Sequence, residues 1–492
     1  MRIILSGYNI DTTVLNELKE RCPPRADVTP ETLSAAYARI SRHPQSVDEL
    51  RAVARGEVEK ARRSNRAIIF KMGHHSVAEH AVFNFDIIGI SRRAIEELEK
   101  FRLCSYTEKS QRYIKLKDDF VIPAEVIRAG QVESFTSIIA EQNALYHELY
   151  RKLKPYFFEG HPEMMEEARN RTTLNGWAKE DARYIVSLAT EGQLGLTINA
   201  RNLEFLIRRF ASRNLDELRG LQQRMYELAK EVAPSIILFT ESNAYDGETY
   251  PALGRVAAVH VDSIAPNACR PVSLVGKSAD GDVLLISALL HTVSGRSYAA
   301  CRRAAEKLSL AEKTDLVKTA CRRMEFYDGT LREFEYPDLT FELVISATCF
   351  AQLKRHRMAT ITTQPYDPNL DVTVPPSVRE IGAEDDFRRM IVRTNDVYSR
   401  LRSKMEEAAD YVLTNAHRRR VLLKVNAREL YHISRLREDA TAQWDIRCIA
   451  AEMSRLAKEA MPLTHMLLGG KDAYPEVYEK VYGKLPKLLP PE

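Results

Sequence analysis

An internal repeat is the feature that most constrains how this chain can fold. The segment Thr197-Ile-Asn-Ala-Arg-Asn-Leu203 recurs as Lys424-Val-Asn-Ala-Arg-Glu-Leu430, at an offset of 227 positions (426 − 199). The segments 91–102 and 346–357 also correspond, at an offset of 255 (346 − 91). With 492 residues, the chain is too long for one ordinary hydrophobic core. We therefore expect two related modules in tandem.

The two copies share one predicted order of elements. Extended runs with alternating apolar residues begin at Phe83-Asn-Phe85 and at Leu339-Thr-Phe341, and each run precedes a helical pattern. Apolar residues recur every three or four positions over 48–66, 124–153 and 396–413, which is typical of amphipathic helices. The order strand, helix, irregular loop and helices thus occurs twice, and helix dominates.

The stretch between the copies favours turns. From about residue 245 to 282 it holds Asp-Gly, Tyr-Pro, Ala-Pro and Arg-Pro steps, which interrupt helices. We therefore predict a first module over 1–245, a linker over 246–282 and a second module over 283–492.

Composition excludes several classes of protein. A hydrophobic content of 45% and a charged content of 28% are ordinary for a folded globular chain, and a net charge of +4 does not favour nucleic acid as a partner. Basic runs such as 417–420 and 62–66 are explained as solvated helix faces. No stretch approaches the roughly 18 apolar residues of a membrane span, and the amino terminus lacks the pattern of a secretory signal. We expect a cytoplasmic protein without a membrane partner.

Neither cysteine nor histidine usage predicts a metal site. The seven cysteines are scattered without a Cys-x-x-Cys pair, so we expect reduced and mostly buried thiols. His74, His75 and His80 lie close together in the sequence, but no carboxylate or cysteine set accompanies them.

Two segments have the side chains of an anion site. Arg355-His356-Arg357 ends a helical run, and Asn426, Arg428, His432 and Arg437 follow in a second helix, with Arg428, His432 and, less closely, Arg437 near one stripe. A stripe of donors is costly to bury without a polar ligand. In the first copy, Ser110 and Arg112 combine a short hydroxyl with a planar guanidinium, which can cradle a phosphate. Taken alone, each segment is also compatible with a solvated basic turn or an ordinary Ser/Thr turn.

Together these motifs resemble the flavin-dependent thymidylate synthases. That family carries Arg-His-Arg, seven residues and a Ser, usually continuing to x-Arg-Tyr, between a Gly-x-Ser-Arg helix and an Asn-Ala-Arg helix. The first half keeps Gly89-Ile-Ser-Arg92, Ser110 and Arg112-Tyr113, but has Lys100-Phe101-Arg102 where Arg-His-Arg belongs. The second half keeps Arg355-His356-Arg357, but has Pro365 and Asp367 where the Ser and Arg belong. The family's Gly-His-x-Ser-x-x-Glu-His and Ala-Gln-x-Glu-Ile-Arg segments are similar to 73–80 and 442–447.

The resemblance implies an α+β fold of two tandem modules, each a small, mostly antiparallel sheet packed with several α-helices. It implies FAD as cofactor, NADPH and methylenetetrahydrofolate as co-substrates, and reductive methylation of dUMP at C5 without an enzyme nucleophile. Carried over from the family, the flavin contacts are Arg355, His356, Arg357, Asn426, Arg428, His432 and Arg437, with Arg102, Asn199, Arg201, Arg209 and His74 as weaker counterparts. The nucleotide contacts are Glu108, Ser110, Gln111, Arg112 and Arg183, with Gln352 from the other half. Arg437, Arg355 and Arg112 are the expected catalytic residues.

The opposite losses in the two halves suggest that they complement each other. The first half would supply the phosphate cradle and the second half the flavin clamp, whereas the reciprocal pairing would be inactive. Asp410 stands sixteen residues before Asn426, where the first half has Arg183 before Asn199, and its charge would repel a phosphate. Family members are homotetramers, so a tandem chain would form a homodimer of four modules.

Two alternatives stay open at this point. The changes at Lys100, Phe101, Pro365 and Asp367 allow another acceptor, either a different pyrimidine nucleotide or a base in RNA. The duplicated fold could also persist as a catalytically inert flavin- or nucleotide-binding scaffold. Uptake of FAD by the purified protein separates the scaffold from the enzymes.

Overall fold

The computed structural model of the chain describes residues 11–21, 29–39, 44–71, 74–112, 114, 116–261, 263–264 and 270–487. Four residues used in the sequence argument, Cys22, Gly73, Tyr113 and Cys269, lie outside these ranges, as do parts of the predicted linker.

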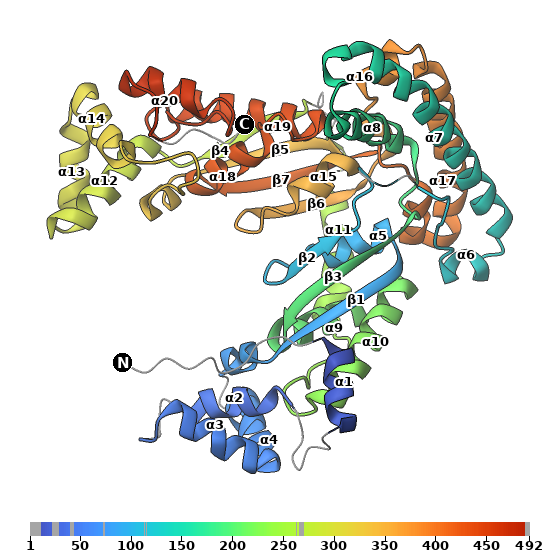
Figure 1. Cartoon of the computed structure of the whole chain (residues 1–492), viewed down its shortest axis with the longest axis horizontal. Coiled ribbons are helices and arrows are strands. Elements are labelled where there is room, and N and C mark those ends of the chain that lie inside the picture. The colour runs from blue at the N-terminus through green and yellow to red at the C-terminus, as the bar shows by residue number, and fades with distance from the viewer. Residues whose placement is uncertain are drawn as a thin grey trace.

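Two antiparallel sheets form the frame of the molecule (Figure 1). The first has the order β1-β3-β2 and contains β1 (Val82–Ser91), β2 (Ser105–Glu108) and β3 (Glu191–Asn199). The second has the order β4-β5-β7-β6 and contains β4 (Val272–Lys277), β5 (Asp338–Ser346), β6 (Thr360–Tyr366) and β7 (Arg418–Asn426). The register is repeated, since β1 and β3 pair from Val82 with Asn199, and β5 and β7 from Asp338 with Asn426. The predicted α+β fold of two tandem modules is confirmed.

The repeated motifs mark the points where strands turn into helices. Ser91 and Ser346 cap α5 (Arg92–Leu98) and α15 (Ala347–Leu353), and each hydroxyl accepts a hydrogen bond from a backbone N–H of the first turn. Asn199 and Asn426 cap α9 (Ala200–Ala211) and α18 (Ala427–Arg437) in the same way. A side-chain oxygen at this position satisfies a backbone donor that the helix leaves unpaired. The Asn-Ala-Arg repeat thus has a structural role in both halves.

The halves meet in a short strip of backbone with pseudo-twofold symmetry around the bridge between Ser187 and Thr414. The hydrogen bonds come in matched pairs, namely Leu188 N to Leu413 O (2.8 Å) with Asn415 N to Val186 O (2.9 Å), and Ala189 N to Tyr411 O (2.9 Å) with Ala416 N to Tyr184 O (2.8 Å). Within each pair, one bond becomes the other when both residues are moved to the equivalent positions 227 residues away in the other half. The two modules therefore pack as a symmetric dimer would, within one chain.

Helices pack against one face of each sheet, and exposed and buried side chains alternate along β1, β3 and β7. The first half adds α1 (Thr12–Arg21), α2 (Glu31–Arg39), α3 (Val47–Gly56), α4 (Val58–Arg66), η2 (Ala67–Lys71), η3 (His75–His80), α6 (Ala124–Arg128), α7 (Val132–Gly160), η4 (Pro162–Met164), α8 (Ala168–Ala182), η5 (Arg183–Ile185), α10 (Asp216–Val232) and α11 (Ala244–Val261). The second half adds α12 (Gly281–Ser294), α13 (Tyr298–Lys307), α14 (Leu310–Cys321), η6 (Arg332–Glu335), η7 (Pro368–Leu370), α16 (Pro376–Glu380), α17 (Glu384–Met405), η8 (Glu406–Val412), α19 (Trp444–Ala460) and α20 (Tyr474–Tyr482). The three predicted amphipathic helices occur, but each is divided into two elements.

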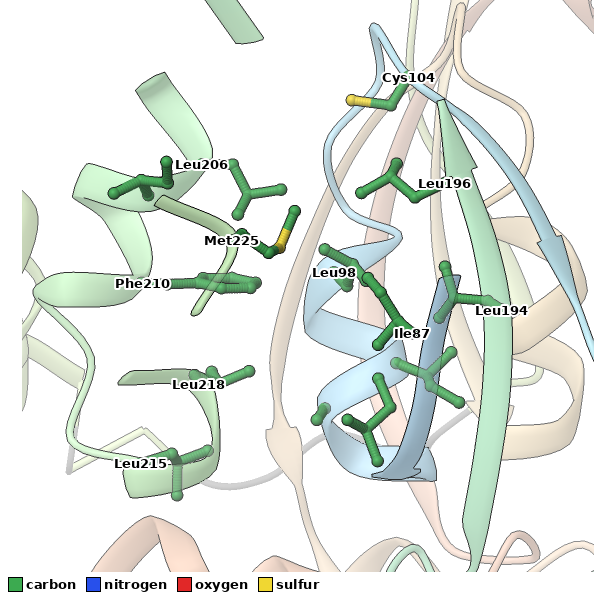
Figure 2. Close-up of a cluster of buried hydrophobic side chains, with 14 of the residues drawn as sticks. Ile87, Leu98, Cys104, Leu194, Leu196, Leu206, Phe210, Leu215, Leu218 and Met225 are labelled. Carbon is green, nitrogen blue, oxygen red and sulfur yellow. The ribbon is translucent and has the colours of Figure 1, made fainter. Parts of the chain in front are cut away.

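Each half has its own hydrophobic core, and a third core is shared. Figure 2 shows part of the first, where side chains of β1, α5 and β3 face side chains of α9 and α10 across the module. The second core gathers around β5, β7 and α19. The shared core is built largely from α7, α8 and α17, and Figure 1 shows α7 and α17 side by side. Burial of apolar surface across the junction thus adds to the backbone strip in holding the halves together.

The predicted linker over 246–282 is wrong as a turn-rich segment. It contains most of α11, with Pro251 inside the helix, and β4, which pairs with β5 at the edge of the second sheet. Asp246 near the start of α11 forms ion pairs with Arg208 and Arg209 of α9, both at 3.0 Å. These tertiary contacts override the local preference for turns.

A tyrosine of each half shares a carboxylate with the capping serine of the other half. Tyr184 and Ser346 both donate to Asp445 Oδ2, at 3.0 and 2.6 Å. Tyr411 and Ser91 both donate to Glu217 Oε2, each at 2.6 Å. These paired contacts couple the helix caps to the junction.

Tyr184→Phe removes one of these hydroxyls and is expected to lower the free energy of unfolding by about 1–3 kcal/mol, because it leaves buried polar partners unsatisfied. Urea denaturation measures the change. Tyr245→Phe is the control, since Tyr245 is 76% exposed and its change should be neutral. Equal effects of the two substitutions would contradict the prediction.

Candidate active site

At the junction, the second half's Arg-His-Arg segment contacts the first half's cradle. Arg355, just beyond α15, donates to Glu108 Oε2 of β2 at 2.8 Å. Arg357 donates to the backbone oxygen of Cys104, immediately before β2. The two motifs that the sequence keeps in opposite halves are therefore neighbours within one chain.

Three guanidinium groups lie near one another at this contact. Arg437, at the end of α18, donates to Gln352 O at 3.1 Å and to His356 Nε2 at 2.9 Å. Burial, together with the positive charges of Arg355 and Arg112, lowers the pKa of Arg437 to about 10. Burial is the larger cause of the lowered pKa, and the two neighbouring cations add to it, which indicates positive charge close to Arg437. This cluster is therefore suited to an anion.

The loop after β2 contributes the first half's residues to this site. Ser110 Oγ accepts from the backbone N–H of Arg112 at 3.2 Å. The Arg112 side chain donates to Glu180 at 3.0 Å and reaches the second half at Thr441 O, at 3.1 Å. Gln111 accepts from Asn415, also of the second half, at 3.2 Å. Gln111 and Arg112 of this loop are thus held by contacts across the junction.

A chain of buried polar side chains also belongs to this site. Gln352 Nε2 donates to Gln443 Oε1 at 2.6 Å, and Arg183 donates to the same oxygen at 3.4 Å. Burial lowers the pKa of Arg183. Gln352 Oε1 is buried and accepts no hydrogen bond from the described residues. Since buried polar atoms are normally paired, this oxygen fits a donor on a ligand.

The flavin-side residues cluster around His356. Burial lowers the pKa of His356, which keeps the imidazole neutral, and its ring contacts that of His432 with centroids 5.7 Å apart. Its buried Nδ1 makes no hydrogen bond with the described residues, although it lies 3.6 Å from Glu429. Asn426 uses its amide oxygen as a helix cap, and Arg428 forms an ion pair with Glu335 at 2.6 Å. The unpaired acceptor and ring nitrogen beside clustered cations fit a cofactor with phosphates and a polar ring edge.

The weaker first-half counterparts do not form a comparable cluster. Arg201 pairs with Glu79 at 2.6 Å and Arg209 with Asp246 at 3.0 Å, so their charges are neutralised locally. Asn199 caps α9, Arg102 donates to Ala359 O at 3.3 Å, and His74 is exposed ahead of η3. Phe101 packs against Phe205 and Phe210, where the second half has His356, His432 and Arg437. On this side an aromatic cluster therefore stands where the second half has polar side chains, and Phe205 is 38% exposed.

The cavity beside the cradle depends on Gly192. It is lined by Arg92, Glu108, Ser110, Gln111 and Gly192, among others. The equivalent of Gly192 in the second half is Arg419, 227 positions later (419 − 192). Arg419 is buried, stacks on the Tyr366 ring at 4.2 Å and pairs with Glu96. An arginine side chain thus fills in the second half the space that glycine leaves in the first.

Ion pairs close the rest of the reciprocal site. Arg93 pairs with Glu97 at 2.5 Å and Glu407 at 2.8 Å, and lies 3.6 Å from Asp410. Lys100, the counterpart of Arg355, also pairs with Glu97, at 2.7 Å. Asp367, the counterpart of Arg112, caps η7 by accepting from Asn369 N at 2.9 Å. We refer to the region of Arg93, Lys100 and Asp367 as the closed site. We refer to the cluster around Arg355 as the open site.

Sequence reasoning missed several residues of the open site. Arg92, Glu180 and Gln443 were not singled out, although Arg92 lies in the Gly-x-Ser-Arg motif and Gln443 in the 442–447 segment. Their partners come from distant segments, which local spacing does not reveal. Among the described residues, no group of three or more His, Cys, Asp or Glu side chains is arranged to hold a metal ion. None of the helices in the described ranges is long and apolar enough to cross a bilayer.

The closed site predicts a pH effect on stability. Burial raises the pKa of Asp410 to about 6, despite Arg93 and Arg402 nearby. The folded state therefore binds this proton more tightly than the unfolded state, and the stabilisation fades as pH rises from about 4 to about 6. Asp410→Asn does not titrate, so relative to wild type its unfolding free energy should improve by about 1–3 kcal/mol between pH 4 and pH 7. Urea melts at both pH values measure this, and a difference that is constant or reversed would contradict it.

Comparison with known proteins places the chain in a family. The family model described as thymidylate synthase complementing protein matches residues 26–235 and 275–463. A flavin-dependent thymidylate synthase of Geobacter sulfurreducens is 33% identical over 215 residues, which are 42% of this chain and 80% of that protein. A UPF0159 protein of Chlamydia muridarum is 24% identical over 421 residues, 81% of this chain and 79% of that protein. Among solved structures, a UMP/dUMP methylase from Streptomyces cacaoi bound with 5-Br dUMP is 21% identical, covers 39% of this chain and 92% of that chain, and has a TM-score of 0.30. The chain belongs to the thymidylate synthase complementing protein family, that of the flavin-dependent thymidylate synthases, and carries its module twice.

Proposed function

We propose that the protein catalyses the FAD-dependent reductive methylation of dUMP at C5, with methylenetetrahydrofolate and NADPH as co-substrates. Family membership supports a flavin-dependent nucleotide methyltransferase at a coarser level. The observation that carries the proposal is the gathering of Arg112, Arg355 and Arg437 where the two halves meet. Neither half has all three cations.

The roles follow from chemistry and position. Ser110, Arg112 and Arg183 would bind the nucleotide phosphate, because a hydroxyl and guanidinium forks match its oxygens. Gln352, with its buried unpaired oxygen, would accept from a polar edge of the nucleotide. Arg437 would stabilise negative charge that develops on the uracil ring, since a fixed cation in a partly buried site needs no reorganisation.

The residues around His356 would hold the flavin. Arg355, His356, Arg357, Asn426, Arg428, His432 and Arg437 are the set we assign to it. When bound, reduced flavin supplies the hydride for the reaction. His356 is buried and neutral, so it can orient a polar ring edge without adding charge.

The position of the four departures from the family pattern removes an objection to a dUMP-like acceptor. Lys100 and Asp367 are engaged within the closed site, Pro365 lies on β6 beside Tyr366, and Phe101 is in the first-half core. None of them lines the cavity beside the cradle among the described residues. Their replacement therefore weighs little against dUMP at the open site.

We further propose one working site per chain and a homodimer of four modules. The closed site is filled by Arg419 and its ion pairs, so only the open site would accept ligands. An inert scaffold is the competing function, and a purified protein that shows no flavin absorbance and takes up no added FAD would support it instead.

Substitutions at matched positions test the reaction. Arg112→Ala and Arg355→Ala should each lower tritium release from C5-labelled dUMP by about 10²–10³-fold, because each removes a cation that binds developing or fixed negative charge. Asp367→Ala and Lys100→Ala change the equivalent positions in the closed site, and per folded molecule they should keep wild-type activity. Loss of activity in all four variants, or in none, would contradict the assignment.

Nucleotide stoichiometry tests the closed site independently of turnover. Calorimetric titration of the flavin-loaded protein with dUMP should saturate at about one nucleotide per chain, since guanidinium and carboxylate groups fill the second place. Binding of two equivalent nucleotides per chain would show that the reciprocal site is functional.

A further inference from the structure

Two consecutive arginines at the start of α5 serve opposite sites. Arg92 donates to Glu108 Oε1 at the open site, and Arg93 pairs with Glu97 and Glu407 at the closed site. Their side chains are similarly buried, 7% and 4% exposed. The pair therefore provides a natural comparison between a residue beside the open site and a structural neighbour.

Glu108 is shared between a buried and a partly exposed cation. Its Oε1 accepts from Arg92, and its Oε2 accepts from Arg355 at 2.8 Å. The Glu108 side chain is only 8% exposed, whereas that of Arg355 is 43% exposed. Burial opposes the charge of Glu108, yet Arg92, Lys354 and Arg355 together keep its pKa below the usual value. This carboxylate is thus ionised and needs a cation beside it at all times.

An anionic ligand would compete with Glu108 for Arg355. A buried carboxylate that loses its partner carries a large desolvation penalty, so release of Arg355 would be costly if it were the main partner. Arg92 remains in contact with the other oxygen when Arg355 moves. Lys354 is less able to neutralise Glu108 when Arg355 moves, because its ammonium lies 3.0 Å from Glu99.

The arrangement is found on one side of the pseudo-twofold axis. The counterpart of Arg92 is Ala347 (347 − 92 = 255), and that of Glu108 is Thr363 (363 − 108 = 255). Neither residue of the Arg92–Glu108 pair is repeated at the closed site. The pair therefore accompanies the open site and is not needed to build the module.

We propose that Arg92 is a positioning residue of the open site: it neutralises Glu108 and so lets Arg355 exchange that carboxylate for an anionic ligand. This inference rests on the proposed function only for the identity of the ligand. Arg92 touches neither the ligand nor the cofactor in this role and acts through Glu108. Its removal leaves Arg355 as the main partner of a buried carboxylate and holds it there.

Nucleotide binding by the flavin-loaded full-length chain is the first test. Arg92→Ala should weaken dUMP binding by about tenfold or more and raise KM more than it lowers kcat, because truncating one partner of a buried charge pair redistributes the others. Arg92→Lys should restore most of the affinity by returning the charge. Arg93→Ala is the matched control, and it should lower the melting temperature without changing dUMP affinity. Equal affinity losses in Arg92→Ala and Arg93→Ala would reduce Arg92 to a structural residue and overturn the proposal.

Chemical modification of Arg355 supplies a readout that needs no substrate. Phenylglyoxal labelling, located by peptide mass mapping, should modify Arg355 more slowly in Arg92→Ala and in the milder Arg92→Gln than in wild type or Arg93→Ala. Unchanged or faster labelling in both Arg92 variants would overturn the proposal. If wild type binds no dUMP while the labelling follows the expected order, the proposed function fails and the exchange at Glu108 stands.

Discussion

The backbone strip around Ser187 and Thr414 is the contact on which the rest of the structure depends. Its paired hydrogen bonds place the capped helices α5 and α15 on either side of one pseudo-twofold axis. Because the cap of each helix also shares a carboxylate with a tyrosine from the other half, the ends of both helices are fixed relative to the junction. The open and closed sites both form where these helices meet the opposite module.

Charge, more than backbone, distinguishes the two sites. The open site gathers Arg112, Arg355 and Arg437, and burial, together with the charges of the other two, lowers the pKa of Arg437. The closed site combines Arg93, Arg419 and Lys100 with Glu96, Glu97 and Glu407, so its charges satisfy one another. Breaking a buried pair by removing one partner is strongly destabilising, which gives the closed site a structural role. The same scaffold therefore supports a cationic cluster on one side and a closed network of ion pairs on the other.

Much of the fold could be predicted because the repeated segments themselves determine where strands end and helices begin. The Asn-Ala-Arg segments end strands and cap helices in both halves, so their spacing predicts where α9 and α18 begin. The gathering of Arg112, Arg355 and Arg437 was also expected from motifs. The structure of 246–282 could not be predicted, because α11 is held by ion pairs from Asp246 to Arg208 and Arg209 of α9. Those arginines lie earlier in the chain, and local sequence patterns do not reveal the contact. The contact of Arg92 with Glu108 likewise depends on the turn between α5 and β2, and the spacing of residues in the sequence does not predict it.

Gly192 and Arg419 show what covalent linkage of the modules makes possible. An added Cβ at position 192 would lie 2.6 Å from Ile95 Cδ1, so even a small side chain would crowd the cavity there. Two identical chains meeting on a true dyad must carry the same residue at both places, and both cavities would then be hollow or both filled. In a tandem polypeptide the two equivalent places are separate residues of one chain, so they can differ. One polypeptide can carry glycine beside a cavity in one module and, at the equivalent place in the other, an arginine that binds across the junction.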